Sequence, residues 1–182
     1  IIQNNSSTGN GGGAYFHITE SQITDCIFKQ NTSNRGGAIF FDDGDIDLNK
    51  VVMAGNSSTE HGGRMYLVCG SIVNIIKETV YGNSGSSSMW VSCNSELYFL
   101  NSIIWNNPGW GTENGCNDNQ EEIEVEYSVV QGGNDGLGTI DADPLFTDPE
   151  NGDFNLQLTS PCIDSGDPDP QFNDPDGTRA DM

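Results

Sequence analysis

Apolar residues recur along the first 133 residues in a pattern that repeats about every 25 positions. An asparagine marks each copy, and successive markers are 26, 25, 27 and 24 residues apart. The markers are Asn5, Asn31, Asn56, Asn83 and Asn107, and a sixth copy ends at Gly133. The positions 10, 8, 5 and 3 residues before the last four markers and before Gly133 form mostly apolar columns. Alternation by two is strand spacing, and the step of three indicates a bend between two strands.

The columns are regular enough to predict the fold class. Before Asn56 the column residues are Ile46, Leu48, Val51 and Met53, and Glu78 is the clear misfit in the next copy. Few stretches show helical periodicity. A period near 25 with about three short strands per turn predicts an all-β, right-handed parallel β-helix of about six rungs, stacked about 4.8 Å apart.

The marker asparagines and the small residues after them predict how the rungs turn. Stacked side-chain amides can bond to one another and satisfy backbone groups at a turn. We therefore interpret the Asn-x-Ser/Thr matches at Asn5, Asn31 and Asn56 as ladder positions rather than glycosylation sites. Glycine pairs follow three of the markers and permit tight corners. These pairs are Gly12–Gly13, Gly36–Gly37 and Gly62–Gly63.

Charge and proline divide the chain. Residues 1–112 hold 9 acidic and 5 basic side chains, whereas residues 113–182 hold 18 acidic and one basic. All 7 prolines lie at or beyond Pro108. We expect β-helix rungs over 1–133, with an acidic insertion at 108–122, and an irregular acidic capping segment over 134–182 that packs on the helix.

The net charge of −21 bears on partners. Nucleic acid and anionic membrane surfaces are poor partners, because like charges repel, and we expect neither nucleic-acid binding nor membrane insertion. No apolar run approaches the roughly 18–20 residues of a membrane helix. The chain starts within the repeat pattern and lacks a signal peptide, so we expect part of a longer secreted protein.

Two stretches carry a family resemblance. FKQNTSNRGGAIFF resembles the repeats of right-handed parallel β-helix surface proteins, including the polymorphic outer-membrane protein type. The stretch from IDADPLF through SPCIDSGDP to DPDGTRADM is similar to the C-terminal segment of large secreted bacterial β-helix proteins. The resemblance implies the β-helix fold and an extracellular, secreted or cell-surface location. It leaves the chemistry open, because this architecture hosts adhesins, polysaccharide lyases and glycoside hydrolases alike.

The five cysteines also fit an oxidising, extracytoplasmic compartment. A Cys116–Cys162 disulfide is the preferred pairing, since it would link the C-terminal segment covalently to the last rungs. Cys69 and Cys93 occupy similar places in consecutive rungs, where they could stack or cross-link. Cys26 lies on a core column and is expected to be a small buried hydrophobe.

The one basic cluster that the repeat builds is the candidate catalytic site. The repeat should stack Arg35 beside His61, with Arg64 close by. A lyase acting on acidic polysaccharides needs a base and a cation, and these side chains could supply them. The alternative interpretation is exposed corner residues with one contact to Glu60.

Acidic turns make calcium the candidate cofactor. Alternating aspartates around a glycine can gather oxygen ligands for calcium, although ordinary solvated turns need no ion. The candidate ligands are Asp42, Asp43, Asp45 and Asp47 around Gly44, and Asp174, Asp176 and Asp181 around Gly177.

Aromatic residues in the later rungs are candidate carbohydrate contacts. Trp90, Trp105, Trp110 and Tyr98 could line an exposed face and stack on sugar rings. Alternatively, the C-terminal segment folds over this face and buries the rings.

Two functions follow from these residues. The favoured one is a non-enzymatic extracellular rod that acts as a structural, adhesive or carbohydrate-contacting element. The alternative is the C-terminal part of a polysaccharide lyase or glycoside hydrolase of the pectate-lyase-like superfamily. The rod is favoured because the early loops are short, and the one long insertion, 108–122, lacks Lys, Arg and His. Whether the chain is an enzyme, its glycan ligand and its oligomeric state stay open.

Overall fold

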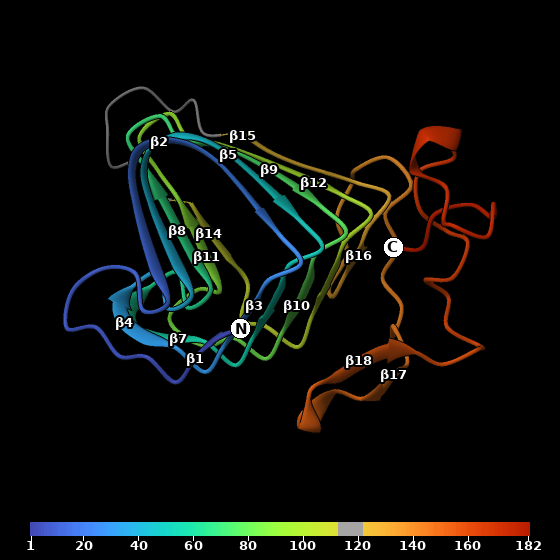
Figure 1. Ribbon diagram of the computed structural model, residues 1–182, viewed down its shortest axis with the longest axis horizontal. Helices are drawn as coiled ribbons and strands as arrows, with labels where there is room; N and C mark the ends of the chain where they lie inside the picture. Colours follow the sequence, from blue (N-terminus) through green and yellow to red (C-terminus); the bar gives the residue numbers. More distant parts are fainter. Residues whose placement is uncertain (113–121) are drawn as a thin grey trace.

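The structure is a computed structural model that describes residues 1–112 and 122–182. Its strands stack in parallel into a β-solenoid, which confirms the predicted all-β parallel fold (Figure 1). One sheet contains β1 (Ile2–Gln3), β3 (Ile27–Lys29), β6 (Val52–Ala54), β10 (Thr79–Tyr81), β13 (Ile103–Trp105) and β16 (Val129–Val130). A small second sheet pairs β4 (Thr32–Arg35) with β7 (Ser57–His61).

The third sheet is the largest and bends around a corner of the solenoid. It contains β2 (Ala14–Thr24), β5 (Ile39–Asn49), β8 (Met65–Val68), β9 (Ile72–Ile76), β11 (Met89–Val91), β12 (Glu96–Leu100), β14 (Trp110–Thr112) and β15 (Glu122–Glu126). The first half of β5 pairs with β8 and its second half with β9. The bend falls at Gly44, where φ is 139° and an added Cβ would lie 2.1 Å from the carbonyl oxygen of Thr19. At this position a side chain would clash with the neighbouring rung, and glycine avoids the clash.

The predicted apolar columns fill the interior of the solenoid. The side chains of Ile46, Leu48, Val51 and Met53 are at most 1% exposed. Neighbouring rungs align these columns residue for residue, so that Leu48 pairs with Ile75, and Ile75 pairs with Phe99. Close parallel stacking thus buries one continuous core along the axis.

The marker asparagines form the predicted internal ladder. Asn31 Nδ2 donates to Asn56 Oδ1 at 3.0 Å, and Asn56 Nδ2 donates to Asn83 Oδ1 at 2.9 Å. Asn56 Nδ2 also donates to the carbonyl of Phe28 at 2.9 Å. The side chain of Asn56 is fully buried, so these bonds replace those that water would make.

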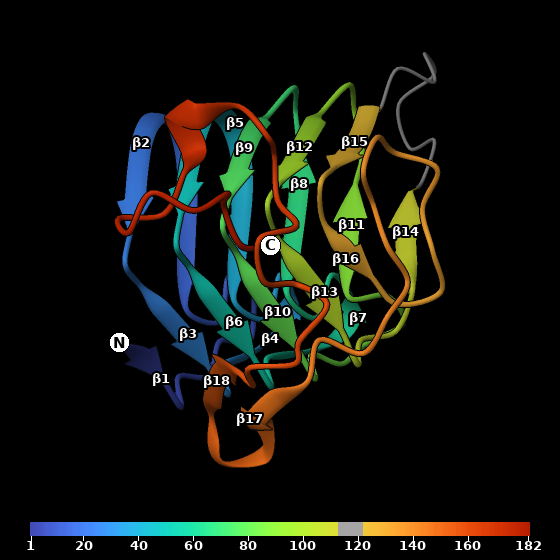
Figure 2. The same cartoon turned by 90° about the vertical axis from the view of Figure 1, so that its right-hand side faces the viewer.

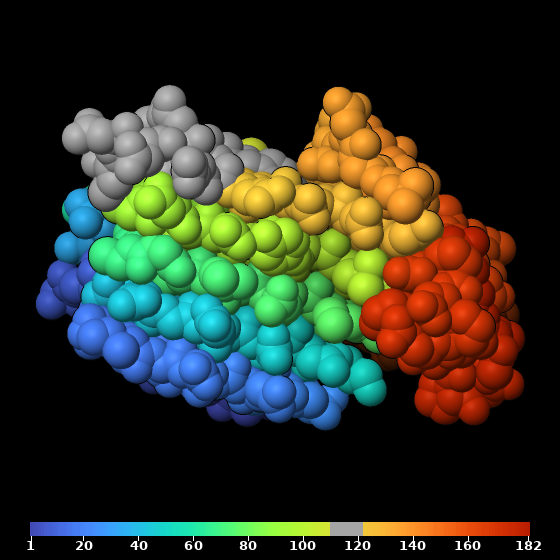
Figure 3. Space-filling model, turned by 90° about the horizontal axis from the view of Figure 1, so that it is seen from above, coloured from blue at the N-terminus to red at the C-terminus, as the bar shows by residue number. Residues whose placement is uncertain are grey.

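The C-terminal residues cover an end and a side of the solenoid. The turn over 131–140 lies on the last rung, where the Val130 amide donates to the Ile140 carbonyl at 3.0 Å. Residues 141–182, here called the C-terminal strap, then run back along the side of the rungs (Figures 2 and 3). The strap contains β17 (Phe146–Asp148), β18 (Asp153–Leu156) and short 3-10 helices at Pro149–Asn151 and Pro170–Phe172.

The strap is held by apolar packing and by polar contacts with several rungs. Phe146, Cys162 and Met182 are buried with Ile103 and Val129 of the solenoid. Lys77 Nζ lies 2.7 Å from Asp174 Oδ1. The strap therefore contacts the solenoid through both apolar and charged side chains.

We expect Asn56→Ala to lower the free energy of unfolding by about 3 kcal/mol, because it leaves buried donors and acceptors of two neighbouring rungs unpaired. Urea unfolding followed by circular dichroism measures this change. The exposed Asn10→Ala variant is the control and should stay within about 0.5 kcal/mol of wild type. Equal stability of both variants would contradict a structural ladder.

Candidate functional site

The structure brings together two of the three candidate catalytic residues. Arg35 pairs with His61 across β4 and β7, as the repeat predicts. Arg35 Nε lies 2.6 Å from Glu60 Oε2 in an exposed ion pair. The His61 ring stacks on Trp90 with 3.9 Å between ring centroids, and its Nδ1 lies 2.6 Å from Ser86 Oγ. Both side chains are thus engaged in contacts that support the corner.

Arg64 does not join this cluster, which corrects the expectation from the repeat. Its side chain points into the solenoid and is 0% exposed. Its Nη2 lies 3.1 Å from Glu78 Oε2, and its Cζ lies 4.9 Å from the centroid of the Phe99 ring. The misfit in the apolar columns, Glu78, is therefore the buried partner of Arg64.

This buried pair is electrostatically costly. Arg64 Nε and Nη1 and Glu78 Oε1 have no hydrogen-bond partner among the described residues. Burial raises the pKa of Glu78 to about 7, against the opposing effect of the Arg64 charge, and burial lowers the pKa of Arg64. Desolvation thus outweighs the attraction between the two groups.

The predicted aromatic face is divided between different parts of the molecule. Trp90 is only 8% exposed, because it lies in an aromatic ladder with Phe40 and Tyr66 and beneath His61. Trp105 is partly buried and packs against a cluster that includes Phe146 of the strap. The side chain of Trp110 lies outside the described part of the chain. Trp105 also lines a small depression of about 240 Å³ beside the strap, and Tyr98 lines a larger, open one.

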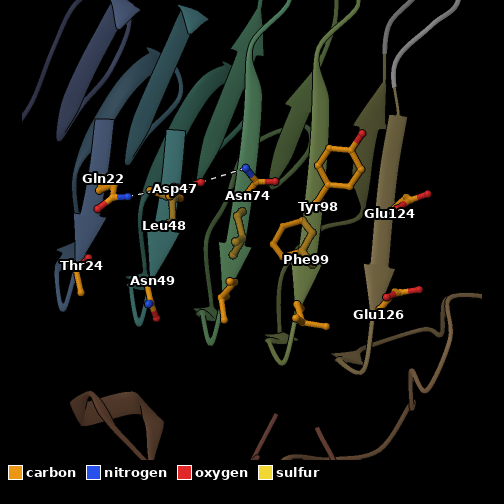
Figure 4. A pocket seen from close by; sticks show the side chains of 13 residues that line it. Gln22, Thr24, Asp47, Leu48, Asn49, Asn74, Tyr98, Phe99, Glu124 and Glu126 are labelled. Atoms are coloured by element: carbon orange, nitrogen blue, oxygen red, sulfur yellow. Dashed lines mark hydrogen bonds between the residues drawn. The ribbon is translucent and has the colours of Figure 1, made fainter. Parts of the chain in front are cut away.

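That depression is a groove of about 570 Å³ on the outer face of β2, β5, β9, β12 and β15 (Figure 4). Two rows of side chains line it, one residue from each successive rung. The first row is Gln22, Asp47, Asn74, Tyr98 and Glu124. The second row is Thr24, Asn49, Ile76, Leu100 and Glu126. Its lining residues include three carboxylates and no Lys, Arg or His.

Hydrogen bonds fix several of these side chains. Asp47 accepts from Asn74 Nδ2 at 3.0 Å and from Gln22 Nε2 at 3.4 Å (Figure 4). The Tyr98 hydroxyl donates to Glu96 Oε2 at 2.8 Å. This bond to a carboxylate, with further acidic neighbours, raises the pKa of Tyr98 to about 12, so the phenol stays protonated. The groove thus offers a row of positioned polar groups beside apolar Ile76 and Leu100.

Sequence reasoning singled out Tyr98 and Asp47 but missed the rest of the groove. The first row occupies the position nine residues before each copy's end, between two core columns. Strand alternation turns that position outward. The residue types there vary, so no apolar periodicity marks the row.

The candidate calcium ligands do not gather into a site. Within residues 1–112 and 122–182, no group of three or more His, Cys, Asp or Glu side chains is placed to hold a metal ion. Asp42 accepts from the Tyr15 hydroxyl at 2.6 Å, Asp174 pairs with Lys77, and Asp176 accepts from the Thr178 hydroxyl at 2.7 Å. The other predicted ligands are Asp43 and Asp45 at the bend, Asp47 in the groove, and Asp181 in the strap.

The predicted cysteine pairings are not formed either. Cys162 is a free, fully buried thiol in the strap, and Cys116 lies outside the described residues. Cys69 is free and exposed, so it is not cross-linked to Cys93, which is disulfide-bonded. Cys26 is a free cysteine that packs against the core but is only partly buried, whereas a buried residue was expected.

Comparison with known proteins gives one family match. The profile of the Chlamydia polymorphic membrane protein (Chlamydia_PMP) repeat matches residues 25–42. No curated protein matches the chain, and no solved structure does. Where the structure describes the chain, no helix has the length and apolarity needed to cross a bilayer. The repeat match and the β-solenoid together fit a cell-surface β-helix protein.

The buried ion pair yields a stability prediction. At pH 8, where Glu78 is ionised, we expect Glu78→Leu to lower the free energy of unfolding by about 3–5 kcal/mol, because it leaves the Arg64 charge unpaired. The double variant Arg64→Met/Glu78→Leu should return to within about 1 kcal/mol of wild type or exceed it. Urea unfolding of the four proteins of this double-mutant cycle tests the prediction. A double variant less stable than both single variants would contradict it.

The same pair should also make stability depend on pH. The pKa of folded Glu78, about 7, lies above the usual 4.5, so the folded protein holds this proton more tightly than the unfolded chain. Relative to the double variant, wild type should therefore lose stability as pH rises from 4.5 to 7, at up to about 1.4 kcal/mol per pH unit. If the free energies of unfolding of the two proteins changed in the same way with pH, the raised pKa of Glu78 would be refuted.

Proposed function

We propose that this protein is a cell-surface β-helix rod that contacts carbohydrate through the groove on β2, β5, β9, β12 and β15. The observation that carries the proposal is the alignment of polar side chains with an open aromatic ring along the solenoid axis. Polar groups placed beside apolar surface are the usual composition of a small-molecule site.

The spacing of the rungs suits an extended sugar chain. Neighbouring strands lie about 4.8 Å apart, which is close to the advance of one residue in an extended hexose polymer. Successive sugars could therefore meet successive members of the row. Asp47 and Asn74 offer hydrogen bonds to hydroxyl groups, and the Tyr98 ring offers an apolar face to sugar C–H groups.

A lyase receives less support from the geometry. Its proposed cation and base would come from Arg35, His61 and Arg64, but Arg64 is buried and Arg35 is paired with Glu60. Among the described residues, the groove lining holds no side chain that could act as a cation.

One observation favours a hydrolase as the second candidate. Glu124 and Glu126 lie two residues apart on the same face of β15, which places them roughly 6.8 Å apart along the strand. Inverting glycoside hydrolases hold their two carboxyl groups roughly 6.5–9.5 Å apart. Product formation that is lost in Glu124→Gln and Glu126→Gln would establish this activity.

We expect Tyr98→Ala to weaken binding of a glycan ligand about tenfold, because it removes the aromatic ring of the outward-facing row of the groove. The measurement is titration of a panel of soluble oligosaccharides, with new reducing ends followed in parallel. Tyr15→Ala removes another exposed tyrosine, on β2 outside the groove lining, and should leave binding unchanged. A folded protein that binds no member of a broad panel would overturn the proposed function.

A further inference from the structure

We propose that the groove prefers glycans that carry free amino groups, such as partly de-N-acetylated hexosamine chains, over neutral and uronate-containing chains. This inference rests on the proposed function and adds the charge class of its ligand. It follows from the charges that line the groove and from their positions along the axis.

The groove carboxylates have no cationic partner within the described ranges. The ion pairs that the structure describes engage other carboxylates: Asp42, Glu60, Glu78 and Asp174. Asp47 is fixed by neutral amides alone, and Glu124 and Glu126 belong to a strand of alternating glutamates. A ligand ammonium group would supply the missing charge, whereas a uronate would add to the repulsion.

The positions of the carboxylates define the spacing of the charges that they can receive. Asp47 and Glu124 stand in the same row, separated by Asn74 and Tyr98. Three strand spacings place them about 14 Å apart. The two middle positions present an amide and an aromatic ring, which suit hydroxyl or N-acetyl groups. The groove therefore fits amino groups about three sugar residues apart, with uncharged residues between them.

Any polycation is attracted to a chain with a net charge of −21, so the test must separate the groove from this general field. The probes are hexamers of β-1,4-linked sugars: N-acetylglucosamine, glucosamine, a half-acetylated mixture, and glucose. Hexagalacturonate and hexalysine are added as a uronate and a non-carbohydrate cation. Affinities are measured by calorimetry at low and moderate salt, at a pH at which the amino groups are protonated.

We expect the half-acetylated and glucosamine hexamers to bind at least tenfold more tightly than the N-acetylated and glucose hexamers. Asp47→Asn/Glu124→Gln should remove this preference, because it lowers the affinity for the amino-bearing hexamers about tenfold more than the affinity for the neutral hexamers. The control Glu20→Gln/Asp135→Asn removes the same charge at exposed positions that do not line the groove and should preserve the preference.

The outcomes separate this inference from the proposed function. Equal binding of neutral and amino hexamers, with loss of both in Tyr98→Ala, would overturn the charge preference and retain the glycan groove. Hexalysine binding that matches glucosamine and falls equally in Asp47→Asn/Glu124→Gln would show a general cation site and overturn the inference. Failure of every sugar hexamer to bind would overturn both.

Discussion

The structure depends on one constraint: each rung must satisfy its buried polar groups through the rung beside it. Many amides at the corners of a turn bond to carbonyls of the next rung, as the Gly36 amide does to the His61 carbonyl. The asparagine ladder supplies such partners: the Asn56 side chain accepts from the Asn31 amide and donates to the Phe28 carbonyl and to Asn83 Oδ1. The same alignment of residues between neighbouring rungs sets the ladder, the sheets and the apolar columns. A shift of one rung by one residue would therefore disrupt all three.

Uniform register also explains why surface features run as rows. A position that faces outward in one rung meets the same position in the next, about 4.8 Å away. Phe40, Tyr66 and Trp90 become an aromatic ladder in this way, and Gln22, Asp47 and Asn74 become one side of the groove. Ligand recognition by such a surface is a property of a row rather than of a single loop.

Sequence reasoning identified the interior of this protein better than its surface. Buried positions are mostly restricted to apolar, small or asparagine side chains. Residues such as Ile46, Leu48 and Asn56 therefore recur at the repeat period and can be recognised in the sequence. Outward positions obey no such restriction, and the groove row therefore stayed hidden apart from Asp47 and Tyr98. Arg64 was misplaced because the residue after a glycine pair lies at a corner, where alternation does not determine which way a side chain points. Its partner Glu78 carried the signal, since a charge in an apolar column requires a counter-charge nearby.

The C-terminal strap has a mechanical consequence for a rod at a cell surface. When each rung contacts only its neighbours, a pulling force can unfold the terminal rungs one at a time. The strap instead contacts several rungs at once, through Lys77, through Tyr81, whose hydroxyl donates to Glu150, and through the Asn101 side chain, which accepts from the Asp167 amide. A force that lifts the last rung must therefore shear these contacts together, so the strap distributes tension over the rungs that it crosses.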